Sequence, residues 1–103
     1  MSEHKALQAN ACYQINESVV TRCIVGETLL VPIAGKLANI QEIFSLNETG
    51  AYIWSKFDGH TSLGDICQRL VDEFEVDEWE AREDISALIE HLSELELIER
   101  MDV

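Results

Sequence analysis

The sequence predicts an α+β domain in which a three-stranded antiparallel sheet is followed by a cluster of three helices. Three observations lead to this fold class. β-Branched residues dominate residues 19–33, the hydrophobic period changes from 2 to 3.6 after Leu46, and three helix-capping signals follow that change. The length of 103 residues fits one domain, and the 47% of apolar residues is typical of a globular protein.

Residues 1–16 are polar and show no hydrophobic period, so they are predicted to form a flexible arm before a folded domain over residues 17–103. The first residues lack the apolar run of a signal peptide. No run in the chain approaches the ~18 apolar residues that a membrane span needs.

Two strands are predicted over Val19–Val25 and Thr28–Ile33, joined by a turn at Gly26-Glu27. A third, weaker strand is predicted over Asn39–Ser45. Its alternation leaves mixed side chains on both faces, which indicates the edge of the sheet.

Asn47, Ser62 and Asp77 are N-cap residues, and each begins a predicted helix. Gly59 is the predicted left-handed stop of the first helix. Apolar residues at helical spacing form the predicted inward faces: Ala51, Ile53, Trp54 and Phe57; then Leu63, Ile66, Cys67, Leu70, Val71 and Phe74; then Ile85, Leu88, Ile89, Leu92 and Leu95. A short extended tail at Leu97-Ile98 ends the fold.

The charge is strongly acidic and unevenly distributed. The chain carries 20 acidic and seven basic residues, a net charge of −13, and almost all of the excess lies after residue 46. Such a chain lacks the lysines and arginines that neutralise phosphates, so a nucleic-acid partner is not expected. The same field would repel an anionic membrane.

The sequence contains no pattern typical of a catalytic or metal site. Cys12, Cys23 and Cys67 form no CxxC pair, and Cys23 and Cys67 are predicted to be buried, inert thiols. Reduced cysteines without an export signal favour the cytoplasm. His60 is placed in a loop and His91 outside the apolar stripe of its helix. We therefore expect no enzyme activity, no cofactor and no metal ion.

The predicted edge strand offers a binding opportunity, since an extended peptide can pair with unpaired backbone groups and add a strand to the sheet. The last helix would form the second wall of the resulting groove. Its flank outside the core stripe consists of Glu83, Asp84, Ala87, Glu90, His91 and Glu94. Alternatively, the edge is covered by the N-terminal arm or by a second copy of the chain, in which case the domain is an interaction or dimerisation module.

One motif runs through the first two helices. It consists of Leu46-Asn47, Gly50, Ile53-Trp54, Asp58-Gly59, Ile66 and Leu70, and an acidic stretch before a leucine-rich last helix follows it. This pattern resembles the PqqD family over about residues 18–100. The resemblance implies a winged-helix-like fold and a recognition element for ribosomally made peptides, which presents a precursor's leader segment to a radical-SAM maturase. In the founding pathway the product is pyrroloquinoline quinone.

The resemblance also implies where the leader would bind. The leader strand would pair with Asn39, Ile40, Gln41, Glu42, Ile43, Phe44 and Ser45, and the helical wall would consist of Glu83, Asp84, Ala87, Leu88 and His91. The expected partners are the precursor leader and the maturase, and the expected state is a monomer or a weak homodimer. A winged-helix regulator that binds DNA is disfavoured because the acidic last helix would face the phosphates.

Overall fold

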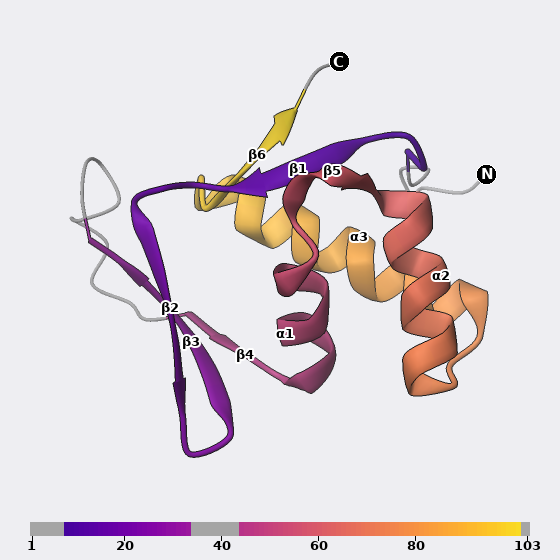
Figure 1. Ribbon diagram of the computed structural model, residues 1–103, viewed down its shortest axis with the longest axis horizontal. Coiled ribbons are helices and arrows are strands. Elements are labelled where there is room, and N and C mark those ends of the chain that lie inside the picture. The colour runs from indigo at the N-terminus through magenta and orange to yellow at the C-terminus, as the bar shows by residue number, and fades with distance from the viewer. Residues whose placement is uncertain (1–7, 34–43, 102–103) are drawn as a thin grey trace.

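The computed structural model describes residues 8–33 and 44–101, and within them it shows two antiparallel sheets and three helices (Figure 1). The elements, in chain order, are β1 (Cys12–Ile15), β2 (Val19–Ile24), β3 (Glu27–Pro32), β4 (Phe44–Leu46), α1 (Glu48–Ser55), β5 (Asp58–Ser62), α2 (Leu63–Phe74), α3 (Glu78–Glu94) and β6 (Ile98–Met101). The strand orders are β2-β3-β4 and β5-β1-β6. The predicted α+β class is confirmed, and the second sheet is an addition to it.

All three helices begin at the predicted caps. The side chain of each cap residue accepts a hydrogen bond from a backbone N–H three residues later: Asn47 from Gly50 at 2.7 Å, Ser62 from Asp65 at 3.2 Å and Asp77 from Glu80 at 2.8 Å. These bonds satisfy amide groups that have no partner inside the helix. The sequence therefore located the helix starts correctly.

The core lies where the three helices meet sheet β2-β3-β4. Its largest fully buried side chains come from the sheet, from each helix and from the segment after α3: Leu30, Ile53, Ile66, Leu70, Ile85, Leu92 and Leu97. A buried indole links α1 to the sheet, because Trp54 Nε1 donates a hydrogen bond to Thr21 Oγ1 at 2.9 Å. The predicted inward faces are buried or half-buried, as expected.

Strands β2 and β3 form a hairpin that projects away from the helices (Figure 1). Its two-residue turn is Val25-Gly26, one position earlier than predicted, and both residues have positive φ, 47° and 80°. Positive φ at both positions is typical of a type I′ turn, whose twist matches that of the two strands. A β-branched residue such as Val25 adopts a positive φ at a cost in free energy. Val25 is 98% exposed, so the tip of the hairpin is apolar and open to solvent.

Part of the segment predicted to be a flexible arm is instead a strand. Residues 12–15 form β1, the central strand of sheet β5-β1-β6, which pairs Ile15 with Ile98 and Cys12 with Ser62. The prediction failed here because a four-residue strand is too short to show an alternating pattern. Both of its partners also lie far away in the chain, where local sequence gives no sign of them. Residues 1–7 of the predicted arm lie outside the described residues.

Gly59 does not end α1. The helix ends at Ser55 with Lys56 as its C-cap, and Gly59 lies within β5, where its φ is +83°. The pairing of β1 with β5 shifts register between Cys12 and Gln14, and the glycine sits at this irregularity. His60 therefore belongs to a strand rather than to the predicted interhelical loop.

Candidate functional site

Within residues 8–33 and 44–101, the outer side of β4 is an open edge of sheet β2-β3-β4. In the described residues β4 pairs only with β3, through Leu46 with Thr28, Ser45 with Leu29 and Phe44 with Leu30. Phe44 and Ser45, the last two residues of the predicted third strand, thus form the start of β4. Residues 39–43 of that prediction lie outside the described residues.

Helix α3 lies beside this strand. The rings of Phe44 and His91 are in edge-to-face contact, with centroids 4.8 Å apart and planes at 82°. Phe44 and Leu88 are both half-buried and pack against the common core. The structure therefore brings together a strand residue and a helix residue that the sequence placed in the same site.

The contact with His91 shows which side of α3 is turned toward β4. Residues three or four positions apart lie on one side of a helix, so Asp84, Leu88, His91 and Leu95 form one stripe, and we call it the groove stripe. Asp84 and His91 are exposed, whereas Leu88 and Leu95 are half-buried. Ala87, one turn before His91, is exposed at the border of the stripe.

Glu83, which the sequence also assigned to the wall, lies elsewhere on the helix. It is exposed, and successive residues of an α-helix are turned by about 100°, so Glu83 points well away from its neighbour Asp84. Leu95 is the groove-stripe residue that the sequence analysis assigned only to the core. Its spacing of seven from Leu88 was the signal that could have placed it beside the groove.

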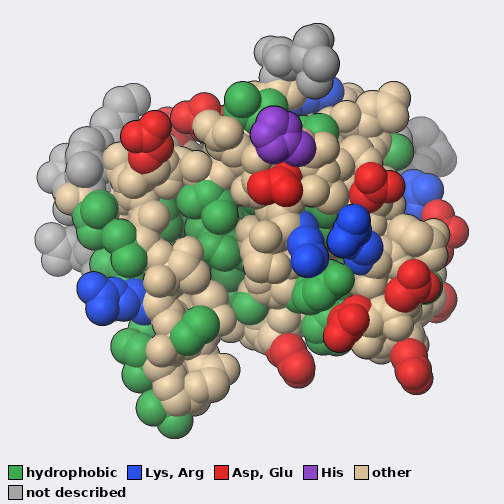
Figure 2. Space-filling model, in the orientation of Figure 1, with side chains coloured by type: hydrophobic (Ala, Val, Ile, Leu, Met, Phe, Trp, Pro, Cys, Tyr) green, Lys and Arg blue, Asp and Glu red, His purple; other side chains and the backbone are tan. Residues whose placement is uncertain are grey.

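The helix wall is strongly acidic. Helix α3 carries six acidic side chains, all exposed: Glu78, Glu80, Glu83, Asp84, Glu90 and Glu94. Its one arginine, Arg82, is bound to Glu78, with Nε and Nη2 at 3.2 and 3.1 Å from the same carboxylate oxygen. Figure 2 shows acidic side chains also spread over the side of the molecule that carries α2, whereas the tip of the hairpin is hydrophobic. A chain lying along α3 would therefore meet a negative field.

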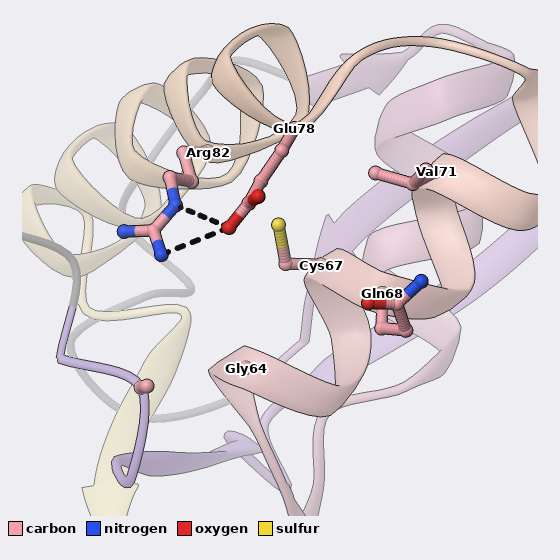
Figure 3. Close-up of a pocket in the computed structure, with 7 residues that line it drawn as sticks. Gly64, Cys67, Gln68, Val71, Glu78 and Arg82 are labelled. Carbon is pink, nitrogen blue, oxygen red and sulfur yellow. Dashed lines mark hydrogen bonds and ion pairs between the residues drawn. The ribbon is translucent and has the colours of Figure 1, made fainter.

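A small cavity of about 190 Å³ is lined by residues of α2 and α3 and by Ala9. It is lined by Ala9, Gly64, Cys67, Gln68, Val71, Glu78 and Arg82, and the Cys67 thiol points toward the Glu78–Arg82 pair (Figure 3). Burial raises the pKa of Cys67; the Arg82 charge acts in the opposite direction, and the Glu78 charge adds to the increase. A thiol with a raised pKa stays protonated at neutral pH and is a poor nucleophile. Cys67 is therefore not an activated thiol.

Other reactive groups in the described residues are separate from one another. No group of three His, Cys, Asp or Glu side chains there could hold a metal ion. All three cysteines are free, although Cys23 is exposed rather than buried as predicted. No described helix is long and apolar enough to cross a membrane.

The hydrogen bonds of Asp58 indicate a structural role for its carboxylate. Its carboxylate accepts hydrogen bonds from the backbone N–H groups of His60 and Thr61, both at 2.8 Å, and from the Thr61 hydroxyl at 3.0 Å. The two backbone bonds, with the hydroxyl adding to them, lower the pKa of Asp58 because they favour its charged form. The carboxylate therefore holds the bend in β5 around Gly59.

The fold is similar to two solved structures. One is "TbiB1 in Complex with the TbiA(beta) Leader Peptide", with 24% identity, a TM-score of 0.69, and coverage of 84% of this chain and 94% of that chain. The other is "Lasso peptide synthetase B1 complexed with the leader peptide", with 24% identity, a TM-score of 0.70, and coverage of 84% and 96%. At this identity the likeness shows a shared fold.

The comparison with curated proteins found no match. The family model described as "Coenzyme PQQ synthesis protein D (PqqD)" matches residues 27–98, which include β3, β4 and all three helices. Because this match covers more than half of the chain, the protein belongs to the PqqD family.

Proposed function

We propose that this protein is a non-catalytic carrier that binds the leader segment of a ribosomally made precursor peptide and presents it to a modifying enzyme. The observation that carries this proposal is that no described strand pairs with the outer edge of β4 beside α3, where His91 contacts Phe44. The two solved structures with this fold are both named as complexes with a leader peptide.

The physical basis of binding is strand addition. An edge strand carries N–H and C=O groups without a partner in the sheet, and an extended peptide can pair with them. The backbone pairing would fix the register of the peptide along the predicted strand Asn39–Ser45. Contacts with the groove stripe of α3 would then select among peptides by their side chains.

The family description favours a role in pyrroloquinoline quinone biosynthesis, and the names of the two solved structures favour a related peptide-modifying pathway. In either case the enzyme that receives the peptide is, in our proposal, a radical-SAM maturase in the cytoplasm. The protein would act as a monomer or weak homodimer and would need no cofactor of its own.

The proposal is tested by nuclear magnetic resonance. The isotope-labelled full chain would be titrated with a synthetic peptide that corresponds to the leader segment of a ribosomally made precursor. We expect amide shift changes at Phe44 and Ser45 and along the groove stripe. Changes confined to sheet β5-β1-β6 or to the hairpin tip would contradict the proposed site.

A matched pair of variants tests the helix wall. His91→Ala removes the ring that contacts Phe44, whereas His60→Ala removes an exposed histidine from the other sheet. We expect His91→Ala to weaken peptide binding about threefold to tenfold, the range typical of a contact of about 1 kcal/mol, and His60→Ala to leave it unchanged. Equal affinities of the two variants would argue against the α3 wall.

An interaction or dimerisation module is the second candidate. The hairpin exposes Ile24 by 52% and Val25 by 98%, and exposed apolar side chains of this kind are found at protein interfaces. Sedimentation of the free chain would distinguish the two functions. A stable dimer in which the β4 edge is covered would favour the module and leave no room for a peptide.

A further inference from the structure

We infer that the groove beside β4 selects a basic peptide, in which lysine or arginine side chains alternate with apolar ones. This inference rests on the proposed function and adds the chemical class of the peptide. It follows from the charges along α3 and from the order of charged and apolar residues on the groove stripe.

The first observation is that α3 carries more acidic than basic side chains. Its one arginine, Arg82, is held by Glu78, and the helix carries further exposed acidic side chains at Glu80, Asp84, Glu90 and Glu94. The other described basic residues belong to other elements: Arg22 to β2, Lys56 to the end of α1, Arg69 to α2 and Arg100 to β6. Strand β4 itself carries no charge, since its residues are Phe44, Ser45 and Leu46.

The second observation is the order of charged, apolar and aromatic side chains along the groove stripe. The His91 ring contacts Phe44, and Leu88, three residues earlier on the same side of the helix, adds a half-buried apolar side chain. Asp84 lies one turn before Leu88 and is exposed. Two turns of helix cover about 10 Å, and a strand advances about 3.3 Å per residue. A peptide strand that follows the helix therefore places residues two to four positions apart against the Phe44–His91 contact and against Asp84.

This spacing fits the alternation of a strand, because residues two or four positions apart point to the same face. An apolar side chain would pack on Leu88 and Phe44, and a basic side chain in the same phase would reach Asp84. Lysine and arginine suit the border between these surfaces, since their aliphatic stems pack on apolar groups while their charges stay in water. An acidic peptide would meet like charges within the screening distance of about 8 Å and would be rejected.

The test is a selection from a displayed library of short random peptides, carried out on the full chain. We expect the selected peptides to carry Lys or Arg in phase with apolar residues, and their affinity to fall as salt is raised. Two variants with the same change of charge follow. Asp84→Lys alters the groove stripe, and Glu90→Lys alters an exposed residue of the same helix that lies about 100° around the helix from His91.

We expect Asp84→Lys to weaken the binding of the selected peptides about threefold to tenfold, because single exposed charge pairs contribute up to about 1 kcal/mol. Glu90→Lys should weaken their binding much less. Reselection on Asp84→Lys should lose the basic preference. Selected peptides that bind at the β4 edge without enrichment of Lys or Arg would overturn the inference and leave the carrier function intact. Equal losses in both variants would also overturn it. Failure to select any peptide that binds at this edge would overturn both proposals.

Discussion

Sheet β2-β3-β4 joins strands that follow one another along the chain, whereas sheet β5-β1-β6 joins strands that are far apart in it. The first begins with a hairpin closed by two residues, Val25 and Gly26. The second pairs Cys12 with both Ser62 and Met101, so its central strand lies between the two later strands. The two sheets therefore differ in what holds them together and in what they leave open.

Sheet β5-β1-β6 ties the ends of the chain to the ends of the helices. Strand β5 runs directly into α2. The first two amides of that helix donate to the segment before β1, Leu63 N–H to the Ala11 carbonyl at 2.9 Å and Gly64 N–H to the Ala9 carbonyl at 3.0 Å. At the other end, Asn16 N–H donates to the Leu97 carbonyl at 2.9 Å, just before β6. Sheet β2-β3-β4 instead projects a hairpin (Figure 1), and no other strand in the described part of the chain pairs with β4 on its outer side. We interpret sheet β5-β1-β6 as the closure of the fold and sheet β2-β3-β4 as the sheet to which, in the proposed function, the peptide adds.

The largest expected effect is a loss of stability from a change in the core of sheet β2-β3-β4. Leu30 is fully buried between Thr21 of β2 and Phe44 of β4, so Leu30→Ala leaves a cavity. We expect this variant to lower the free energy of unfolding by about 2–5 kcal/mol. Urea denaturation followed by tryptophan fluorescence measures it.

The control is the adjacent residue of the same strand. Leu29 pairs with Arg22 and Ser45, and it points to the other face of the sheet, where it is only half-buried. Leu29→Ala should therefore cost less than half as much. Similar losses at both positions would show that the outer face of the sheet is covered as well as the inner one.

The next effect concerns the link between this sheet and α1. Thr21→Val removes the hydroxyl that accepts the hydrogen bond of Trp54 Nε1, and the indole is buried. Leaving a buried donor without its partner costs about 1–3 kcal/mol, and we expect a loss of that size in denaturant unfolding. Thr21→Ser keeps the hydroxyl and should stay near the native value. A Thr21→Val variant as stable as Thr21→Ser would show that the bond adds nothing to stability.

The sequence allowed most of one sheet and all three helix starts to be predicted, because their signals are local. Asn47, Ser62 and Asp77 act within three residues of themselves, and the two strands of the hairpin are adjacent in sequence. The sequence also predicts that the third strand lies at the edge of this sheet, and among the described strands β4 pairs only with β3. The contact between Phe44 and His91 confirms that α3 lies beside this edge.

The other sheet could not be predicted from local signals. Tyr13 pairs with Arg100, which lies at the far end of the chain, and β5 contains Gly59 and polar residues rather than an alternating apolar pattern. The motif Asp58-Gly59 predicts a helix stop, and this prediction is wrong. A glycine with positive φ serves a strand irregularity as well as a helix end, and only the pairing with Gln14 distinguishes the two.

Two glycines, one in each sheet, sharpen the comparison. Gly26 and Gly59 have φ values of 80° and 83°, so alanine at either position adopts a conformation that costs about 1–2 kcal/mol. A Cβ at Gly26 meets nothing within 4 Å, whereas a Cβ at Gly59 lies 3.1 Å from Gln14 Oε1 and 3.5 Å from Gln14 Cβ.

We therefore expect Gly59→Ala to lower the free energy of unfolding more than Gly26→Ala does, both measured by urea denaturation. The double variant Gly59→Ala with Gln14→Ala should recover the difference, because the crowding comes from the Gln14 side chain. If Gly26→Ala proves the more harmful of the two, the hairpin and not the long-range sheet is the more strained element.

The smallest expected effect is that of a single exposed charge in β5, and its dependence on pH identifies it. The backbone N–H groups of His60 and Thr61 lower the pKa of Asp58 below its ordinary value of 3.8. A carboxylate whose pKa is lower in the folded state than in the unfolded one stabilises the fold above the unfolded pKa, and this contribution disappears as the pH falls through the folded pKa.

Asp58→Asn keeps the shape of the side chain without its charge. The native chain should thus have the higher thermal midpoint at neutral pH, and the two midpoints should converge below about pH 3.8. Thr61→Val, which removes only the hydroxyl donor, should show a smaller version of the same pH dependence, because both backbone donors remain. A constant difference between native and Asp58→Asn chains over the whole acid range would mean that the charge of Asp58 does not stabilise the bend that joins α1 to the long-range sheet.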